Sequence, residues 1–146
     1  MTNWVTLDQT ELNLPHQETV KGVTVEVMLS PYDIPSHVRG DYDSEIDKFV
    51  IEFKYLGAEP TKYVRQSDSL SLRVGKNSGR VYAIEIDVDH LKAEAVQLKM
   101  LAPQVAANAI DRMPSAPEGR RGNIDVVKQV VGDHRRDLIE PLTSRR

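Results

Sequence analysis

Residues 74–90, VGKNSGRVYAIEIDVDH, contain the pattern that decides the fold of this chain. On both sides of GKNSG, apolar side chains alternate with polar ones, which is typical of strands that have one buried face. GKNSG itself supplies two glycines and an asparagine, residue types that accept a positive φ, and therefore predicts the turn of a β-hairpin. The apolar positions of the two strands are Leu70, Leu72 and Val74, then Tyr82, Ile84, Ile86 and Val88.

The same alternation occurs in three further segments. It is found in VTVEVMLS (23–30), in DKFVIEFKYL (47–56) and, more briefly, in TKYVRQ (61–66). Together with the hairpin, these segments predict a largely antiparallel sheet of about five strands with one apolar face. Residues 1–17 show no period and are expected to form an irregular arm. The apolar side chains of this arm that are expected to pack on the core are Trp4, Val5 and Leu7.

After residue 88 the apolar period changes to that of a helix. In DHLKAEAVQLKMLA (89–102), Asp89 is a suitable N-cap and the apolar positions lie three or four residues apart. We expect this helix to cover the apolar face of the sheet, because such a face must be buried. PSAPEGRRGN (114–123) indicates a linker. Beyond Asn123 a last amphipathic helix is predicted, with its apolar face formed by Ile124, Val127, Val131 and Leu138.

These elements predict an α+β fold, in which an antiparallel sheet packs against a helix. Residues 1–117 are expected to form the α+β domain, and residues 118–146 the linker and a C-terminal helical extension. The segment 47–89, which ends in SGRVYAIEIDV followed by Asp89, resembles a small bacterial β-rich domain family of unknown function. The resemblance implies a β-rich core and supplies no catalytic residues. The strand at 23–30 and both helical segments beyond residue 90 lie outside it.

The run EIDVDH suggests a polar site on the last strand. Glu85, Asp87 and Asp89 point to one strand face about 7 Å apart, as carboxylates of a Mg²⁺ or Ca²⁺ site would. His90 next to them has the chemistry of a general base. Aromatic side chains at 49, 53, 55 and 82 are expected in the core, with a small-molecule pocket between sheet and helix as the alternative. The solvated face of a strand is the simpler explanation of the acids, so no catalytic residue and no metal ligand is assigned. The candidate ligand-binding residues are Tyr82, Glu85, Asp87 and His90.

Two other motifs resemble known functional motifs, but the surrounding sequence does not fit the function of either. DYDSEIDKFVIE (41–52) places acids at the spacing of a calcium-binding loop. That loop requires glycine at its sixth position, where this chain has Ile46, and it is followed by a helix where this pattern predicts a strand. The expectation is therefore an acidic loop that leads into a strand. RGD at 39–41 is attributed to chance.

Composition excludes several classes of site. The chain has no cysteine, which removes disulfides, thiolate zinc sites and thiol nucleophiles. The N-terminus lacks the features of a secretory signal, and no window approaches eighteen consecutive apolar residues, so a soluble cytoplasmic protein is expected. The formal net charge is −3, which argues against broad nucleic-acid binding. Residues 118–146 carry seven basic and five acidic side chains, however, and a basic tail of this kind is either a solvated terminus or a weak nucleic-acid contact.

The function that this pattern favours is non-enzymatic. We expect a small bacterial protein that acts by binding or by homo-oligomerisation, for example as a homodimer formed through the C-terminal segment, and that needs no cofactor. A small-molecule-binding domain or an enzyme, with its site between sheet and helix, is the alternative. Weak nucleic-acid binding through the basic tail is a third possibility.

Overall fold

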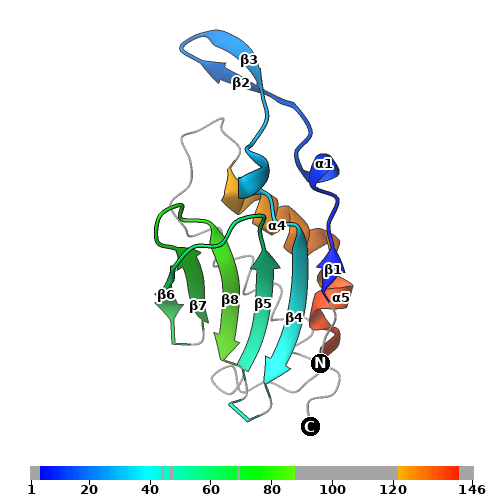
Figure 1. Ribbon diagram of the computed structural model, residues 1–146, viewed down its shortest axis with the longest axis vertical. Helices are drawn as coiled ribbons and strands as arrows, with labels where there is room; N and C mark the ends of the chain where they lie inside the picture. Colours follow the sequence, from blue (N-terminus) through cyan, green and yellow to red (C-terminus); the bar gives the residue numbers. More distant parts are fainter. Residues whose placement is uncertain (1–3, 44, 47, 69, 88–121, 142–146) are drawn as a thin grey trace.

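A computed structural model of the 146-residue chain describes residues 4–43, 45–46, 48–68, 70–87 and 122–141. Its main element is a six-stranded sheet with the order β1-β4-β5-β8-β7-β6, in which every neighbouring pair is antiparallel (Figure 1). The prediction of a mostly antiparallel, β-rich α+β fold is therefore confirmed. The strands of this sheet are β1 (Val5–Thr6), β4 (His37–Asp43), β5 (Lys48–Lys54), β6 (Thr61–Ser67), β7 (Leu70–Gly75) and β8 (Val81–Asp87).

A second sheet contains only two strands and projects beyond the end of the main sheet (Figure 1). It consists of β2 (His16–Val20) and β3 (Val23–Val27). The helices among the described residues are short. They are α1 (Gln9–Leu12), the 3-10 turn η1 (Pro31–Asp33), α4 (Asn123–Asp133) and α5 (Arg135–Ile139).

The β7–β8 hairpin forms where the sequence predicts it. Gly79 has a φ of 74°, the left-handed conformation that favours glycine. The two strands contain a register shift, because Arg73 pairs with Ala83 but the next residue, Val74, pairs with Val81. Tyr82 therefore has no partner on β7. Its expected place on the buried face is taken by Val81, which is fully buried.

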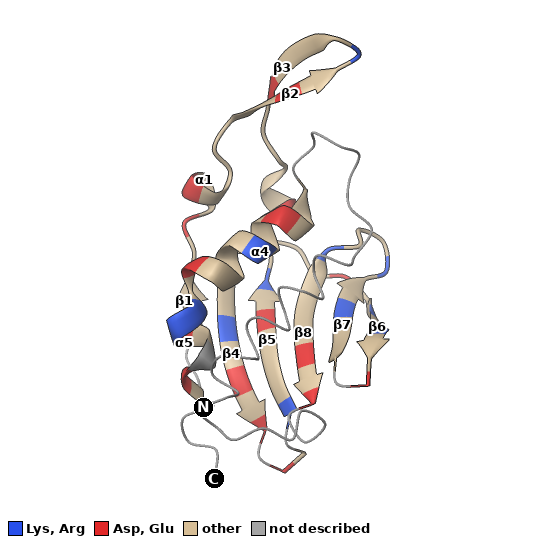
Figure 2. Ribbon diagram, turned by 180° about the vertical axis from the view of Figure 1, so that it is seen from behind, with Lys and Arg blue, Asp and Glu red and all other residues tan. Residues whose placement is uncertain are grey.

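One face of the main sheet carries the hydrophobic core. Phe49, Ile51 and Phe53 of β5 are buried there together with Ile84 and Ile86 of β8. The same cluster contains the valines of α4 and Leu138 of α5, and Figure 2 shows α4 lying across the sheet. The amphipathic helix predicted beyond Asn123 is thus present, divided in two near His134, and its buried side chains are Val126, Val127, Val130, Val131 and Leu138.

Several predictions fall on parts of the chain outside the described residues. These are the helix expected from residue 90, its cap Asp89, the site residue His90, most of the linker and the boundary at 117/118. The arm at 1–17 proves to be structured, since it includes β1, α1 and the start of β2. Val5 and Leu7 pack on the core as expected, whereas the Trp4 ring contacts the charged groups of Arg39 and Lys54 at 4.4 and 4.7 Å.

Two features of the sheet differ from the prediction. The acidic loop expected to begin at residue 41 starts later, because residues 41–43 belong to β4 (His37–Asp43), and the RGD motif lies within that strand. Residues 23–27 do form a strand, but it pairs with β2 and not with the main sheet. The buried face expected for this strand is therefore wrong: Val23 is 60% exposed and Val25 is 39% exposed.

Candidate functional site

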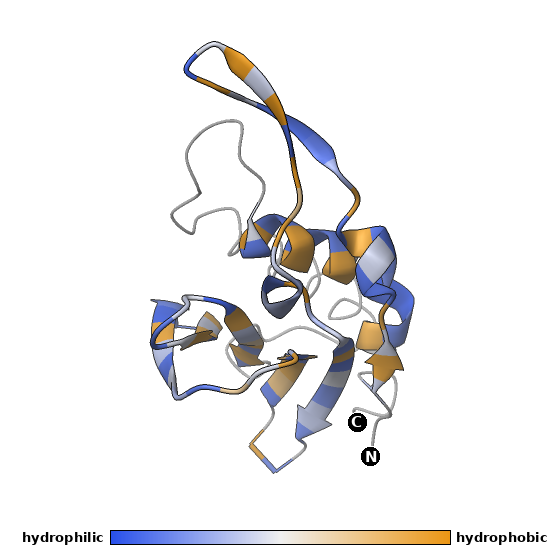
Figure 3. Ribbon diagram, turned by 45° about the horizontal axis from the view of Figure 1, so that its top comes forward, coloured by the Kyte–Doolittle hydropathy of each residue, from blue (hydrophilic) through white to orange (hydrophobic). Residues whose placement is uncertain are grey.

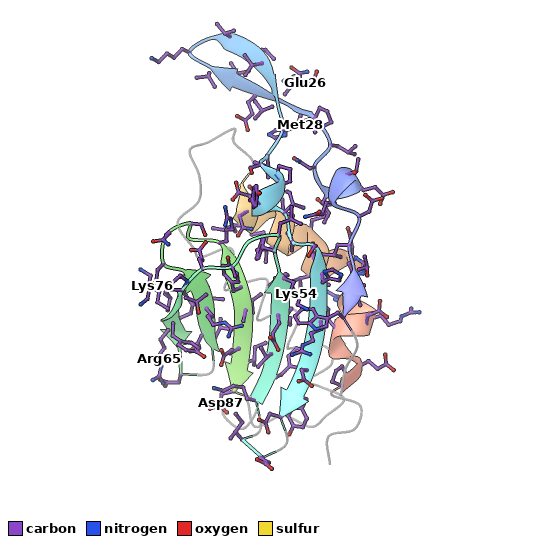
Figure 4. The ribbon with its side chains drawn as sticks, in the orientation of Figure 1. Glu26, Met28, Lys54, Arg65, Lys76 and Asp87 are labelled. Carbon is purple, nitrogen blue, oxygen red and sulfur yellow. The ribbon has the colours of Figure 1, made fainter. Side chains whose placement is uncertain are left out.

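Glu85 and Asp87 lie together on the face of the sheet opposite to Ile84 and Ile86, because side chains alternate along β8. Lys48 of the neighbouring β5 donates a hydrogen bond from Nζ to Glu85 Oε1 at 3.3 Å. Lys48 is also the residue paired with Asp87 across the strands, and Figure 4 shows Asp87 at the end of β8. The side chain of Glu85 is only 12% exposed, whereas that of Lys48 is 37% exposed.

The open face continues as rows of charged side chains across four strands. Glu52 of β5 accepts hydrogen bonds from Arg39 of β4 and lies 3.9 Å from Arg73 of β7. A shallow hollow of about 370 Å³ lies over these rows, with Tyr63 of β6 and Val50 of β5 among its lining residues. Its charged lining residues are Asp41, Asp43, Lys48, Glu52, Arg73 and Glu85.

Negative charge therefore exceeds positive charge in this hollow, and a small cation is the ligand that its charge favours. Two of the carboxylates already form ion pairs with the sheet's own cations, Glu52 with Arg39 and Glu85 with Lys48. Among the described residues no three His, Asp or Glu side chains are arranged to hold a metal ion. A smaller adjoining hollow of about 190 Å³ contains both Glu85 and Asp87.

Tyr82 lies near the opposite end of β8, in a different cluster. Its hydroxyl donates to Glu59 Oε2 at 3.4 Å, and its ring centroid is 5.0 Å from that of Tyr55. The structure thus brings Glu85 and Asp87 together and separates them from Tyr82, while His90 is outside the described residues. Ligand binding by these four residues stays a prediction.

The cluster around Tyr82 is organised by Arg80 and Glu59, which sequence reasoning missed. Arg80 donates to Asp33 Oδ1 at 2.7 Å and to Glu59 Oε2 at 3.3 Å. Glu59 Oε1 accepts the backbone N–H groups of Asn77 and Ser78, both at 3.0 Å. These contacts join η1, the loop before β6 and the β7–β8 turn. No sequence signal could reveal them, because the charged partners are 21 to 47 residues apart.

Asn123, the first residue of α4, ties the helix to the same region. Its Oδ1 accepts from Val81 N at 2.9 Å, and its Nδ2 donates to Asp33 O and to Tyr55 Oη, both at 2.9 Å. Tyr55 Oη in turn donates to Val81 O at 2.7 Å. Burial raises the pKa of the Tyr55 hydroxyl far above its usual range, so this tyrosine stays a neutral donor at every physiological pH.

The electrostatics of Glu59 predict a pH-dependent stability. Hydrogen bonds from Ser78, first from its backbone, hold the Glu59 pKa below the usual value of 4.5. A carboxyl group with a lowered folded-state pKa stabilises the protein above its unfolded-state pKa, and this contribution disappears as pH falls through the folded-state pKa. Glu59→Gln is therefore expected to lower the melting temperature by several degrees at pH 7, with the difference from wild type shrinking below about pH 4.5.

Circular dichroism melts between pH 3 and pH 7 would measure this difference. Glu45→Gln, at an exposed loop position, is the matched control and should leave the melting temperature nearly unchanged. Parallel curves for wild type and Glu59→Gln across the whole range would show that the carboxylate charge contributes nothing to the cluster.

The β2–β3 hairpin carries three exposed valines. Lys21 and Gly22 have φ values of 51° and 80°, which identifies a two-residue type I′ turn. Val20 pairs with Val23, and Glu18 with Val25, so these side chains share one face of the hairpin. Figure 3 shows the hydrophobic residues along this arm. The exposed fractions are 36% for Val20, 60% for Val23 and 39% for Val25.

The edge strands of the two sheets differ in whether a further strand could pair with them. β6, the long edge strand of the main sheet, carries exposed Lys62 and Arg65 and has a register irregularity between Arg65 and Ser67. Charged side chains and bulges of this kind prevent a further strand from pairing. The outer edge of β3 has neither lysine nor bulge, and within the described ranges no strand pairs with it.

Comparisons of the chain with protein-family models, with curated proteins and with solved structures found no match. The resemblance of residues 47–89 to a β-rich bacterial family thus stays a prediction. Among the helices of the described part of the chain, none has the length and apolar character needed to cross a membrane.

Proposed function

We propose that this protein acts by self-association through the β2–β3 hairpin and not by catalysis. The observation that carries the proposal is the hairpin itself, which projects from the main sheet with exposed valines and an unprotected outer strand (Figure 1). Apolar side chains that remain accessible on a projecting element mark a contact surface more often than a free surface.

Energetics support a partner for this hairpin. A two-stranded sheet alone is marginally stable in water, and it gains stability when further strands or another layer cover it. Burying a valine side chain contributes about 1.5–3 kcal/mol. Val23 and Val25 are 60% and 39% exposed, so covering them in both copies buries the equivalent of about two valine side chains, or about 3–6 kcal/mol. This free energy offsets part of the cost of association, and backbone hydrogen bonds must contribute the rest.

The sequence predicted that self-association occurs through the C-terminal segment. In the fold, the helices of this segment form part of the hydrophobic core. Val126, Val127 and Val130 of α4 are fully buried within the chain's own core. Their apolar surface is not accessible to a second copy. The hairpin supplies the accessible apolar side chains that the proposal requires.

Light scattering after size-exclusion chromatography tests the proposal. The wild-type chain is expected to elute with twice its 16.5 kDa mass. Replacing Val23 and Val25 together by lysine removes apolar surface and places like charges in a symmetric contact. This double variant is expected to dissociate, with association weakened at least about a hundredfold.

Tyr63→Lys is the matched control, because Tyr63 is 66% exposed on β6 of the main sheet. It introduces one lysine at an exposure similar to that of Val23, and the dimer should persist. A wild-type chain that is monomeric at all concentrations would overturn the proposal, as would a valine double variant that associates like wild type.

A further inference from the structure

Among the described residues no strand pairs with the outer edge of β3, which presents a defined set of backbone groups. In a two-residue hairpin the residues flanking the turn form a hydrogen-bonded pair, and such pairs then alternate along the ladder. Val20 pairs with Val23 here, so the N–H and C=O groups of Val23, Val25 and Val27 point toward β2. Those of Thr24 and Glu26 point outward.

Resting on the proposed function, we infer that β3 pairs antiparallel with β3 of a second copy, about a two-fold axis at Val25. In this register Thr24 of each copy lies opposite Glu26 of the other. The two positions form two hydrogen-bonded pairs, which satisfy all the outward groups of both residues. Val25 faces Val25 of the second copy, and Val23 faces Val27, so the valines of both strands form one continuous row on one face.

Charge and turn geometry disfavour three alternative symmetric registers. An axis at Glu26 would place two carboxylates opposite each other, which is destabilising across a strand pair. An axis at Thr24 would oppose Glu26 to Gly22, which lies in the turn with a φ of 80° and cannot extend a ladder. Pairing through β2 about Glu18 would again oppose two carboxylates. The Val25 axis on β3 opposes each carboxylate to a neutral threonine and leaves the turn outside the ladder.

The resulting unit is a four-stranded antiparallel sheet built from two hairpins. Three or more strands with an apolar face are what an isolated β-sheet needs for stability. The partner that fits this edge is thus a second copy of the same strand.

The absence of cysteine from the chain permits a direct test by single-cysteine crosslinking. In the inferred register the two copies of Val25 form a non-hydrogen-bonded pair with Cα atoms about 4.5 Å apart, within the range that a disulfide spans. The Val25→Cys variant is expected to form most of its disulfide-linked dimer under mild oxidation. Two copies of Val23 lie roughly 14 Å apart, so Val23→Cys alone should not crosslink.

A mixture of the Val23→Cys and Val27→Cys variants should yield the mixed disulfide dimer, because these positions face each other across the axis. A proline pair gives an independent readout. Thr24→Pro removes an outward N–H and leaves the backbone hydrogen bonds of the hairpin in place, although it loses the hydroxyl contact between Thr24 and Thr19. It should weaken association at least tenfold. Thr19→Pro makes the corresponding change on the outer edge of β2 and should leave association unchanged.

The outcomes separate the register from self-association itself. A dimer by light scattering in which Val25→Cys does not crosslink, or in which Val23→Cys crosslinks with itself as readily, would overturn the inferred register and leave the proposed function standing. A wild-type monomer would overturn both. Crosslinking of Val25→Cys and of the mixed pair, with Thr24→Pro alone disrupting the dimer, is the result that the register predicts.

Discussion

Replacing Gly40 by alanine is expected to destabilise the protein by about 3 kcal/mol or more. Gly40 lies in β4 with its Cα against the backbone of Leu138 in α5, and an added Cβ would overlap Leu138 O and lie 2.8 Å from Leu138 C. A backbone carbonyl cannot rotate away as a flexible side chain does, so β4 and α5 must separate. For a chain of this size the melting temperature should fall by roughly 10 °C.

Gly132→Ala is the matched control, and its expected effect has the opposite sign. Gly132 is exposed in α4, and no neighbouring atom lies within 4 Å of a Cβ built there. Alanine at an exposed helical glycine stabilises by about 0.5–1 kcal/mol. Differential scanning calorimetry of both variants gives the comparison. Equal melting temperatures would contradict the contact between α5 and β4, and with it the inclusion of the C-terminal segment in the core.

Asn123→Ala has the second largest expected effect, a loss of about 3 kcal/mol. The amide of Asn123 makes three hydrogen bonds, to Val81 N, Asp33 O and Tyr55 Oη. Its removal leaves the N–H of fully buried Val81 without this acceptor. An unsatisfied buried donor is more costly than the net value of the bond that it replaces. Urea denaturation would show the loss as a lower midpoint with an unchanged slope.

Two companion variants distinguish the anchoring of α4 by Asn123 from a general effect of removing a side-chain amide. Asn77→Ala, in the exposed β7–β8 turn, should change stability by no more than about 0.5 kcal/mol. Asn123→Asp keeps the acceptor for Val81 N and loses both donated bonds, so its stability should lie between those of wild type and Asn123→Ala. A midpoint for Asn123→Ala equal to that of Asn77→Ala would contradict the role of Asn123 as the anchor of α4.

Local sequence pattern was sufficient for the elements whose side chains alternate strongly. β5, β7, β8 and the turn between the last two follow from apolar residues at every second position and from a glycine that accepts positive φ. The helix beyond Asn123 follows from its valine spacing. β4 was missed because one of its buried positions, next to Leu138, is Gly40, and a glycine contributes no hydropathy signal.

In the candidate site, too, some features follow from the local sequence and others depend on the tertiary structure. That Glu85 and Asp87 share a strand face follows from their spacing alone. That Lys48 neutralises Glu85 depends on the register between β5 and β8, which joins residues 37 positions apart. Tyr82 was expected on the buried face of β8 and was grouped with the acids only as a candidate ligand-binding residue. The register shift beside Val81 leaves it without a partner on β7, and its hydroxyl donates to Glu59.

The sequence by itself determined the strands with strong alternation, where one hairpin turns and which helix has an apolar face, because these depend on neighbours a few residues apart. Only the tertiary structure decided the strand order and the partner of each strand. Residues 23–27 show the reason most clearly. Their alternation specifies that one face is apolar, but it contains no information about what covers that face, which is set by contacts with distant parts of the chain or with another molecule. In this protein those valines lie on a projecting hairpin. The alternation that predicted a strand buried in the core therefore occurs at the proposed contact between two copies.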